Sequence, residues 1–522
     1  MSSRSKFPPK AKKSKQASKS SPESPDEFQA AADAEEETGG KWRAGDKAKS
    51  CRAFLRAIEI YERGLTRHPR DFDLAYNKAR LEFEVSQQPN LVAKLPVSPQ
   101  DFLQQALKSH KYALSLNEGN ADILFNTAQL LISLAELAEE ESDGDGFDPA
   151  LPVAWLREAL ELLSACFSRQ EMLYEEQMQA WNDRDEGEDG GVSLSSETRP
   201  ASRSSTGANR TEQSATVQSA VTPDDLIDTS LASVSALNRL VALDMSDTQT
   251  LASMAQAILT KKLPQLLPLL AEDDRTDRAQ EAALAQASFA AALSHAEHSI
   301  GSISAETYVS RLSIFETLDL SDTEIMCDYA DALIEFSSAT LPTVLSDPSA
   351  LPASYQVLQK ALQLYEQAAT HLSTPTGSKK DADGALSLSL VPKIDTEQEQ
   401  RLGAVQEAIG DARLMVRRVL IAMSDAGAAS PNGADAREEA MRYPRLADGA
   451  YDAAQEAYGR AGDEIAAGKV VVRRIVAGGV GGKAAEVTMR ELSKYGDKGL
   501  RTVRNLVDEE VIGREWLQVI GG

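Results

Sequence analysis

The sequence predicts an all-α protein, and three observations carry this prediction. Only 5% of the 522 residues are aromatic, which does not suit a β-sandwich core. Apolar residues recur at helical spacing between polar stretches. Ala, Leu, Glu and Gln dominate these periodic segments, and such residues favour close-packed helices. We therefore expect helices throughout, separated by polar linkers.

Changes in composition predict six parts. These are 1–38, 39–182, 183–220, 221–373, 374–394 and 395–522. The first part is rich in Ser, Lys and Pro and then in Asp and Glu, and is expected to be disordered because it can bury little apolar surface. The third and fifth parts are expected to be linkers. The other three show helical periodicity, and Thr222 before Pro223 predicts one helix start.

The cysteines and the amino terminus predict an intracellular protein. Cys51, Cys166 and Cys327 lie far apart without a CxxC pair, so neither a disulfide framework nor a thiolate zinc site is expected. The amino terminus lacks the apolar core of a signal peptide, and no run of 18 apolar residues predicts a membrane span.

Charge is distributed unevenly along the chain. The net charge is -25, and the first 20 residues carry +7, which leaves -32 for the remainder (-25 minus 7). An acidic body favours a basic protein partner and repels nucleic acid. The basic cluster in the tail predicts a nuclear-import signal, and thus a protein of nucleus and cytoplasm, although such a tail can also merely aid solubility. Its residues are Lys10, Lys12, Lys13 and Lys15.

A pattern of small and large residues repeats along the helical parts. With Pro69 at position 32 of a 34-residue unit, Thr38 falls at position 1. Small residues at positions 8, 20 and 27 let two antiparallel helices approach closely, while bulky residues fill the gaps between pairs. The predicted packing residues are Gly45, Ala57, Tyr61, Gly64, Ala79, Ala106, Ala113, Ala128, Ala159, Ala330, Ala361 and Ala368.

This pattern resembles the tetratricopeptide-repeat superfamily over about residues 39–180 and, less fully, over 320–373. The resemblance implies an α-solenoid of stacked antiparallel helix pairs, here with long insertions; an irregular helical bundle is the alternative. It also implies a concave groove that holds a partner segment. Asn77 and Asn126 both fall at position 6, where related arrays use asparagine to bind a ligand backbone, because one amide both donates and accepts. Ordinary solvated asparagines are the alternative.

Arrays that grip the acidic tails of heat-shock chaperones resemble this one in scaffold but need a basic clamp. Here Asp46 and Asn126 stand where the clamp would have asparagine and arginine, so a carboxylate ligand would lose its charge-assisted partners. A co-chaperone of that kind is therefore a disfavoured alternative.

Two predicted acidic loops beside the groove would steer a Lys/Arg-rich ligand toward it. The alternative is that they only keep the protein soluble. In functional type the chain looks like the acidic helical-repeat chaperones of newly made ribosomal proteins. The acidic residues are Glu139, Glu140, Glu141, Asp143, Asp145 and Asp148 in one loop and Asp183, Asp185, Glu186, Glu188 and Asp189 in the other.

No catalytic, metal or cofactor site is expected. His295 and His298 lack the P-C-x-x-C of a zinc deaminase and a third ligand. In "RIVAGGVGGKAAE", Gly482 and Lys483 imitate a phosphate-binding loop, but Ala484 replaces the required Ser or Thr. A glycine hinge between helices is favoured there over a nucleotide site, and the protein is not expected to be an enzyme.

The carboxy-terminal part has a local charge of +6 from nine Lys and Arg residues, including Arg473 and Arg474, against three acids between residues 469 and 504. It could touch nucleic acid, an acidic partner or the acidic body of the chain itself. The leading hypothesis is a non-catalytic scaffold or chaperone-like adaptor that binds a basic partner segment in its helical-repeat groove. The alternative is a nucleic-acid-associated factor that uses this basic region. The partner's identity and the oligomeric state do not follow from the sequence.

Overall fold

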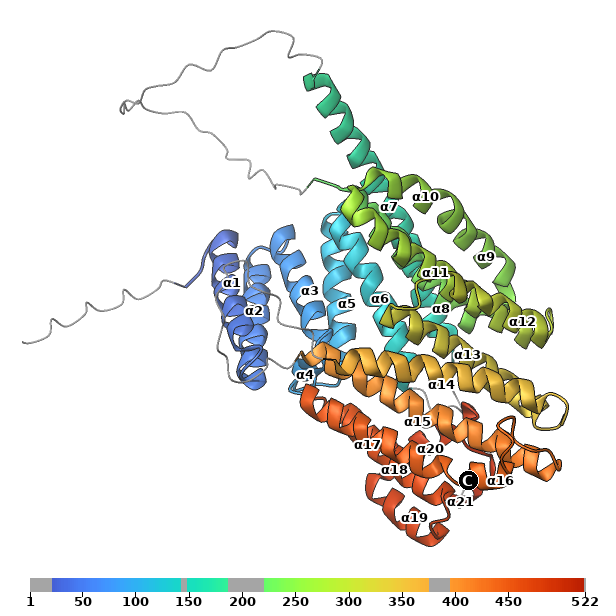
Figure 1. Ribbon diagram of the computed structural model, residues 1–522. Helices are drawn as coiled ribbons and strands as arrows, with labels where there is room; N and C mark the ends of the chain where they lie inside the picture. The colour runs from blue at the N-terminus through green and yellow to red at the C-terminus, as the bar shows by residue number, and fades with distance from the viewer. Residues whose placement is uncertain (1–20, 142–147, 186–219, 375–394, 521–522) are drawn as a thin grey trace, which may run out of the picture. The chain divides into compact units, whose positions relative to one another are not determined.

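The computed structural model describes residues 21–141, 148–185, 220–374 and 395–520, and within these ranges the chain is helical without a strand (Figure 1). The all-α prediction is confirmed. The predicted import signal and almost all of both predicted linkers lie outside the described residues. The helices form two compact units, residues 1–118 and 119–522.

The first unit stacks four long helices in sequence order, with one short helix in the insertion before α5. α1 packs on α2, α2 on α3, and α3 on α5. The helices are α1 (Pro25–Trp42), α2 (Lys47–Arg67), α3 (Phe72–Ser86), α4 (Pro89–Val92) and α5 (Pro99–Leu116).

Helix α1 corrects the expectation of disorder for the described part of residues 1–38. Ser24 caps its first turn in a capping box with Glu27, and Pro25 sits at the first helical position. Phe28 and Ala32 are buried against α2. The acidic residues that suggested disorder have partners on neighbouring helices; Glu36, for example, accepts a hydrogen bond from Tyr61. Acidic composition alone therefore did not prevent this segment from packing.

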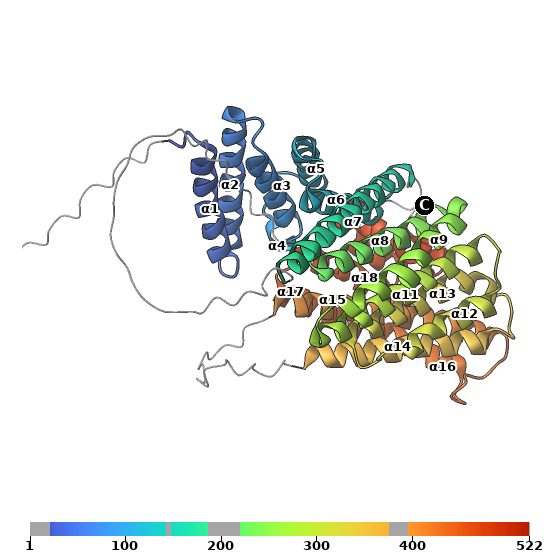
Figure 2. The ribbon, with the colours of Figure 1, turned by 90° about the horizontal axis from the view of Figure 1, so that it is seen from above.

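The second unit continues the same mode of packing through consecutive long helices, seen from two sides in Figures 1 and 2. α7 packs on both α6 and α8, and the contacts then run in order from α8 to α11, α13, α14, α15, α17, α18 and α20. The long helices are α6 (Ala121–Glu141), α7 (Ala150–Asp185), α8 (Pro223–Leu243), α11 (Glu272–Ser299), α13 (Thr323–Val344), α14 (Leu351–Ser373), α15 (Thr396–Asp425), α17 (Tyr443–Ala461), α18 (Glu464–Val480) and α20 (Gly496–Asp508).

Shorter helices occupy the connections between these long ones. They are η1 (Met245–Asp247), α9 (Thr248–Ala257), η2 (Ile258–Lys262), α10 (Leu263–Leu266), η3 (Leu267–Leu269), α12 (Ala305–Leu312), η4 (Ser313–Thr317), α16 (Ala436–Ala440), α19 (Ala485–Leu492), η5 (Ser493–Tyr495) and α21 (Glu515–Val519). The predicted helix starts at Thr222 and near Asp395 are confirmed, because both residues cap their helices with side-chain oxygens.

One spacing marks the second helix of six pairs. Three buried residues of this second helix, at positions i, i+4 and i+7, face the first helix of the pair. The residues at i and i+7 are small, which allows the two helices to approach closely. The triplets are Ala57, Tyr61 and Gly64 of α2; Ala106, His110 and Ala113 of α5; Ala159, Leu163 and Cys166 of α7; Ala287, Ala291 and Ser294 of α11; Ala361, Tyr365 and Ala368 of α14; and Ala447, Tyr451 and Ala454 of α17. The chain is thus an array of antiparallel packed helical repeats.

Two of these pairs, α8 with α11 and α15 with α17, were not identified from the sequence. In the second of them a glycine takes the small position on the first helix: a Cβ on Gly410 would lie 2.2 Å from Cε1 of Tyr451. The insertion around α16 obscures the 34-residue spacing. The triplet of α17 carries the signal that could have revealed this pair.

The first-helix register predicted for the first repeat is wrong. Gly45 lies in the exposed turn between α1 and α2, and a Cβ at this residue would meet open space. Asp46 caps α2 by accepting from the Lys49 backbone N–H. Ala32 fills the small position instead, because most of the first helix lies upstream of Thr38, the predicted start. The predicted second-helix residues of this repeat, in contrast, are buried: Ala57, Tyr61 and Gly64.

The division between the units falls between α5 and α6, rather than in the predicted linker 183–220. Helices α7 and α8, which flank that linker, pack directly on one another. Thr229 of α8 donates to Oε1 of Gln170 of α7 at 2.8 Å, and Phe167 joins Leu226 and Ile227 in one apolar cluster. Helices α6 and α7, which precede the linker, therefore share one unit with the helices that follow it.

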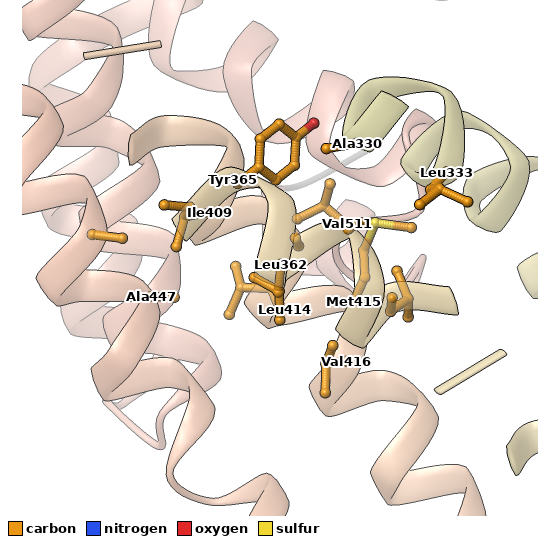
Figure 3. Close-up of a cluster of buried hydrophobic side chains, with 14 of the residues drawn as sticks. Ala330, Leu333, Leu362, Tyr365, Ile409, Leu414, Met415, Val416, Ala447 and Val511 are labelled. Atoms are coloured by element: carbon orange, nitrogen blue, oxygen red, sulfur yellow. The ribbon is translucent and has the colours of Figure 1, made fainter. Parts of the chain in front are cut away.

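The largest apolar cluster runs through the second unit from α11 to α21. Figure 3 shows part of it, where Leu362 and Tyr365 of α14 meet Ile409 and Met415 of α15. Two helices of the described residues, α6 and α8, are long and apolar enough to cross a membrane by length and composition alone, and each packs within this unit. Core helices of soluble proteins meet the same criteria.

Candidate binding cavity

The second unit contains a cavity of about 1170 Å³ whose wall is strongly acidic. Residues of α6, α8, α11, α13, α14, α15 and the end of α20 line it. The lining residues include one arginine, Arg239, and no lysine. The carboxylates of the wall are Glu139, Asp328, Asp331, Glu335, Asp411, Asp508, Glu509 and Glu510.

Helix α13 supplies three of these carboxylates from one face, because Asp328, Asp331 and Glu335 lie three or four residues apart. The Ser288 hydroxyl donates to Asp328, and the Tyr365 hydroxyl donates to Oδ1 of Asp331. Glu335 lies 3.5 Å from Nδ1 of His295. Asp331 and Glu335 are exposed to the cavity, while the surrounding walls limit their hydration.

Asp411 of α15 has more partners than the carboxylates of α13. Its Oδ1 accepts from the Tyr451 hydroxyl at 2.6 Å, and its Oδ2 lies 3.5 Å from the Arg473 guanidinium. Arg473 also pairs with Glu407, Nε to Oε1 at 2.5 Å. This buried network holds Asp411 at the cavity wall.

The cavity makes ionisation of its carboxyl groups unfavourable. Burial raises the pKa of Asp328 to about 6 and that of Asp411 to about 7, although Ser288 and Arg473 respectively oppose these shifts. Burial also raises the pKa values of Asp331, Glu335 and Glu509. Several negative charges share one partly dehydrated space. A cation that enters the cavity would reduce the repulsion between the carboxylates and offset the free energy that they lose by dehydration.

The part of the wall that α8 and α11 form is mostly polar and uncharged. Arg239 is occupied by Glu136 and Glu139 of α6, at 2.7 and 3.6 Å. Oδ1 of Asn238 is buried and has no hydrogen-bond partner in the described structure.

Tyrosines of the repeat triplets hold carboxylates in place. In three pairs the middle residue is a tyrosine whose hydroxyl donates to an acid on the first helix of the same pair. The three combinations are Tyr61 with Glu36, Tyr365 with Asp331, and Tyr451 with Asp411. The packing pattern therefore also positions two carboxylates of the cavity, which the sequence reasoning missed because it treated the triplets as packing residues alone.

The two asparagines predicted to line a groove belong to different units. Asn77 lies on α3 of the first unit and Asn126 on α6 of the second, and both are half-buried. Asn126 is engaged in an interaction within the protein. Ala79 and Ala128, two residues further along these helices, are fully buried, as are Ala330, Ala361 and Ala368 of the later pair.

The predicted acidic loops contribute one residue to the cavity, Glu139. Asp148 instead accepts a hydrogen bond from the Ala150 backbone N–H at 3.0 Å. The side chains of the remaining acidic residues predicted to steer a ligand lie outside the described part of the chain. The carboxylates of α13 and α15 were not singled out from the sequence, because only the fold brings them together.

The histidines and the glycine-rich segment have structural partners. His298 Nδ1 lies 3.2 Å from the Ile303 carbonyl oxygen, and no cluster of metal-ligating residues occurs among the described residues. The Val-rich run before the glycines is the helix α18, and Gly482 adopts a φ of 103° in the turn that follows. Lys483 pairs with Glu491 at 2.5 Å.

The basic region is less uniform than its sequence suggests. Arg473 is buried in the network with Asp411, and Arg474 pairs with Asp448 and Asp452. Neither residue belongs to a free basic surface, and both contact acids of the chain itself, which is one of the three possibilities that the sequence left open. The exposed cations of this region that form no ion pair within the described part of the chain are Lys469, Arg490, Lys494, Lys498 and Arg504.

Comparisons with known proteins add a partial relative and a remote structural likeness. No protein-family model matches the chain. UPF0656 protein C926.02 of Schizosaccharomyces pombe is 37% identical over 136 residues, which are 26% of this chain and 28% of that protein. The match therefore spans little more than a quarter of that relative. Among solved structures, a "circular tandem repeat protein with novel repeat topology and enhanced subunit contact surfaces" aligns over 94% of this chain and 98% of its own, with 12% identity and a TM-score of 0.27.

Proposed function

We propose that this protein is a non-catalytic adaptor of the chaperone-like kind that binds a Lys/Arg-rich segment of a partner protein in the acidic cavity of its second unit. The observation that carries the proposal is the wall of eight carboxylates facing one arginine, which is already paired. The arrangement of helix pairs supports assigning the chain to the tetratricopeptide-repeat superfamily, whose arrays hold peptides in this manner.

Electrostatics favour a cationic ligand over any other. The carboxylates of α13 have raised pKa values because burial penalises their charge, and a Lys or Arg side chain would supply the missing counter-charge. Hydrogen bonds between a carboxylate and an ammonium or guanidinium group are shorter and stronger than neutral ones. Binding of a cationic side chain would therefore be favourable because it neutralises carboxylates whose ionisation is unfavourable in the protein alone.

The size and polarity of the cavity favour a polypeptide segment. Its volume of about 1170 Å³ lies above the roughly 300–1000 Å³ of pockets for small molecules. Polar side chains of α8 and α11, among them Ser235 and Ser299, line the cavity together with the carboxylates. A segment that carries cationic side chains toward α13 could thus contact both the carboxylates and these polar side chains.

A binding measurement with charge-neutralised variants tests the proposal. A fluorescent octa-arginine peptide should bind the intact protein, with affinity that falls as salt rises. A cavity variant with Asp331→Asn, Glu335→Gln and Glu509→Gln should bind at least about tenfold more weakly, since the loss of even one charged hydrogen bond is worth roughly 1.5–3 kcal/mol.

The matched control makes the same change of charge on the exposed surface of α15 and α16, with Glu397→Gln, Asp425→Asn and Glu438→Gln, whose side chains are 76%, 65% and 73% exposed. It should bind like the wild type. Equal losses in both triple variants would reduce the binding to net charge and contradict the cavity assignment.

A second candidate function rests on the exposed cations of α19, η5 and α20. Arg490, Lys494 and Lys498 lie at four-residue intervals and form no ion pair among the described residues. If the adaptor assignment fails, RNA binding is the next property to measure. An affinity for RNA that rises as salt falls, and that is lost in the double variant Arg490→Glu with Lys494→Glu, would support a nucleic-acid-associated factor.

Two expectations from the sequence remain predictions. They are nuclear import through the tail and a groove at Asn77 and Asn126.

A further inference from the structure

Tyrosine-held carboxylates recur at three junctions of the array, and two of them are completed by an arginine from the following helix pair. At the first, Glu36 accepts from Tyr61 at 2.7 Å and pairs with Arg80 of α3 at 2.6 Å. At the last, Asp411 accepts from Tyr451 at 2.6 Å and lies 3.5 Å from Arg473 of α18. In both, a tyrosine and a guanidinium bind the same carboxylate.

The middle junction has the tyrosine and the carboxylate but lacks the arginine. Asp331 accepts from Tyr365, and no lysine or arginine pairs with it within the described part of the chain. The next first helix, α15, offers an acid in place of the cation. Asp411 follows the small residue Gly410 just as Arg80 follows Ala79 and Asp331 follows Ala330.

This incomplete junction opens onto the cavity. Asp331 and Glu335 are exposed to it from successive turns of α13, and Asp411 reaches its wall from α15. Three cations of neighbouring elements are already paired: Arg473 with Glu407 and Asp411, Arg239 with Glu136, and Lys360 with Glu316. The site thus has a fixed carboxylate, an adjoining second carboxylate and space for a side chain.

We propose that Asp331, positioned by Tyr365, is the principal cation subsite of the cavity, and that a lysine or arginine side chain of the partner segment takes the place that Arg80 and Arg473 occupy at the other two junctions. This assignment rests on the proposed function. The partner segment would complete the array's own pattern of tyrosine, carboxylate and cation. Glu335, one turn away, would bind the same cation or the next one along the segment.

The test compares two single substitutions in the same cavity, with octa-arginine peptide as the probe and the full chain as the protein. Asp331→Asn keeps an oxygen that can accept from Tyr365 but removes the charge, and should weaken binding by about 10- to 100-fold. Glu509→Gln makes the same change of charge at a cavity residue that no tyrosine holds, and should weaken binding by less than about threefold.

Thermal unfolding separates a ligand subsite from a structural role. Asp331→Asn should leave Tm unchanged or raise it, because Asp331 has no cation to lose. Glu36→Gln makes the corresponding change at the first junction and should lower Tm, because Arg80 loses the carboxylate with which it pairs at 2.6 Å.

The outcomes distinguish this inference from the proposed function. If the wild type does not bind the peptide even at low salt, the proposed function fails and the subsite with it. If the wild type binds but Asp331→Asn loses no more affinity than Glu509→Gln, or if Asp331→Asn lowers Tm as Glu36→Gln does, only the subsite is refuted.

Discussion

At the residue scale, two glycines of this chain differ in whether the structure has room for a side chain. Gly410 lies inside α15, where Tyr451 occupies the space that a Cβ would need. Gly45 lies in an exposed turn with open space around it and no positive φ. Steric approach between helices, rather than backbone freedom, therefore requires glycine at residue 410.

We predict that Gly410→Ala destabilises the protein by about 2 kcal/mol or more, since the Cβ would lie 2.2 Å from Tyr451 Cε1 and overpacking outweighs the gain in helix propensity. Gly45→Ala should change the unfolding free energy by no more than about 0.5 kcal/mol. Denaturant unfolding of both variants measures this difference. Similar stabilities would contradict the close contact between α15 and α17.

The raised pKa of Asp328 predicts a pH dependence of folding stability that can be assigned to this one side chain. Its pKa is raised from 3.8 to about 6 in the folded state, mainly by burial. The folded protein therefore binds this proton more tightly than the unfolded chain, so this residue lowers stability as pH rises from about 4 to 7.

Asp328→Asn should remove that contribution, because an amide oxygen can still accept from Ser288. At pH 8 the variant is expected to be more stable than the wild type by about 1–2 kcal/mol, and below pH 4 the two should converge. Thermal melts across this pH range provide the measurement. A variant that is less stable than the wild type at pH 8 would show that the carboxylate is stabilising.

At the element scale, α1 shows how a local signal can outweigh composition. The segment after residue 20 is acidic, which favours disorder, yet Ser24, Pro25 and Glu27 form a helix start and Phe28 and Ala32 lie on one face. The acids then bind Tyr61, Arg56 and Arg80. The start signal was readable in the sequence, but the partners of the acids were not.

Loss of the Ser24 cap should loosen the first turn of α1. We predict that Ser24→Ala reduces stability by about 1 kcal/mol, since the hydroxyl accepts from the Glu27 N–H. Hydrogen exchange should accelerate most at the amides of the first turn. Ser21→Ala, at an exposed residue upstream of the cap, serves as the control, and equal protection in both variants would argue against the cap.

At the scale of the whole molecule, each unit is built by repeating one operation, the packing of a helix pair on the preceding pair. Six pairs share the triplet spacing on the second helix, and the outer two residues of each triplet are small. In the second unit this repetition brings α13, α15 and the end of α20 to one cavity, although their residues are separated by up to 180 or so positions in the chain.

The sequence by itself determined the helical class, the starts at Thr222 and Asp395, and most second-helix packing residues, because helix propensity, capping and close approach depend on residue types at short spacing. Only the tertiary structure decided that Arg473 is buried, that α7 and α8 on either side of the linker share one unit, and that Asp331 and Asp411 face the same cavity. These features depend on contacts between residues far apart in the chain, where insertions of variable length remove any fixed spacing.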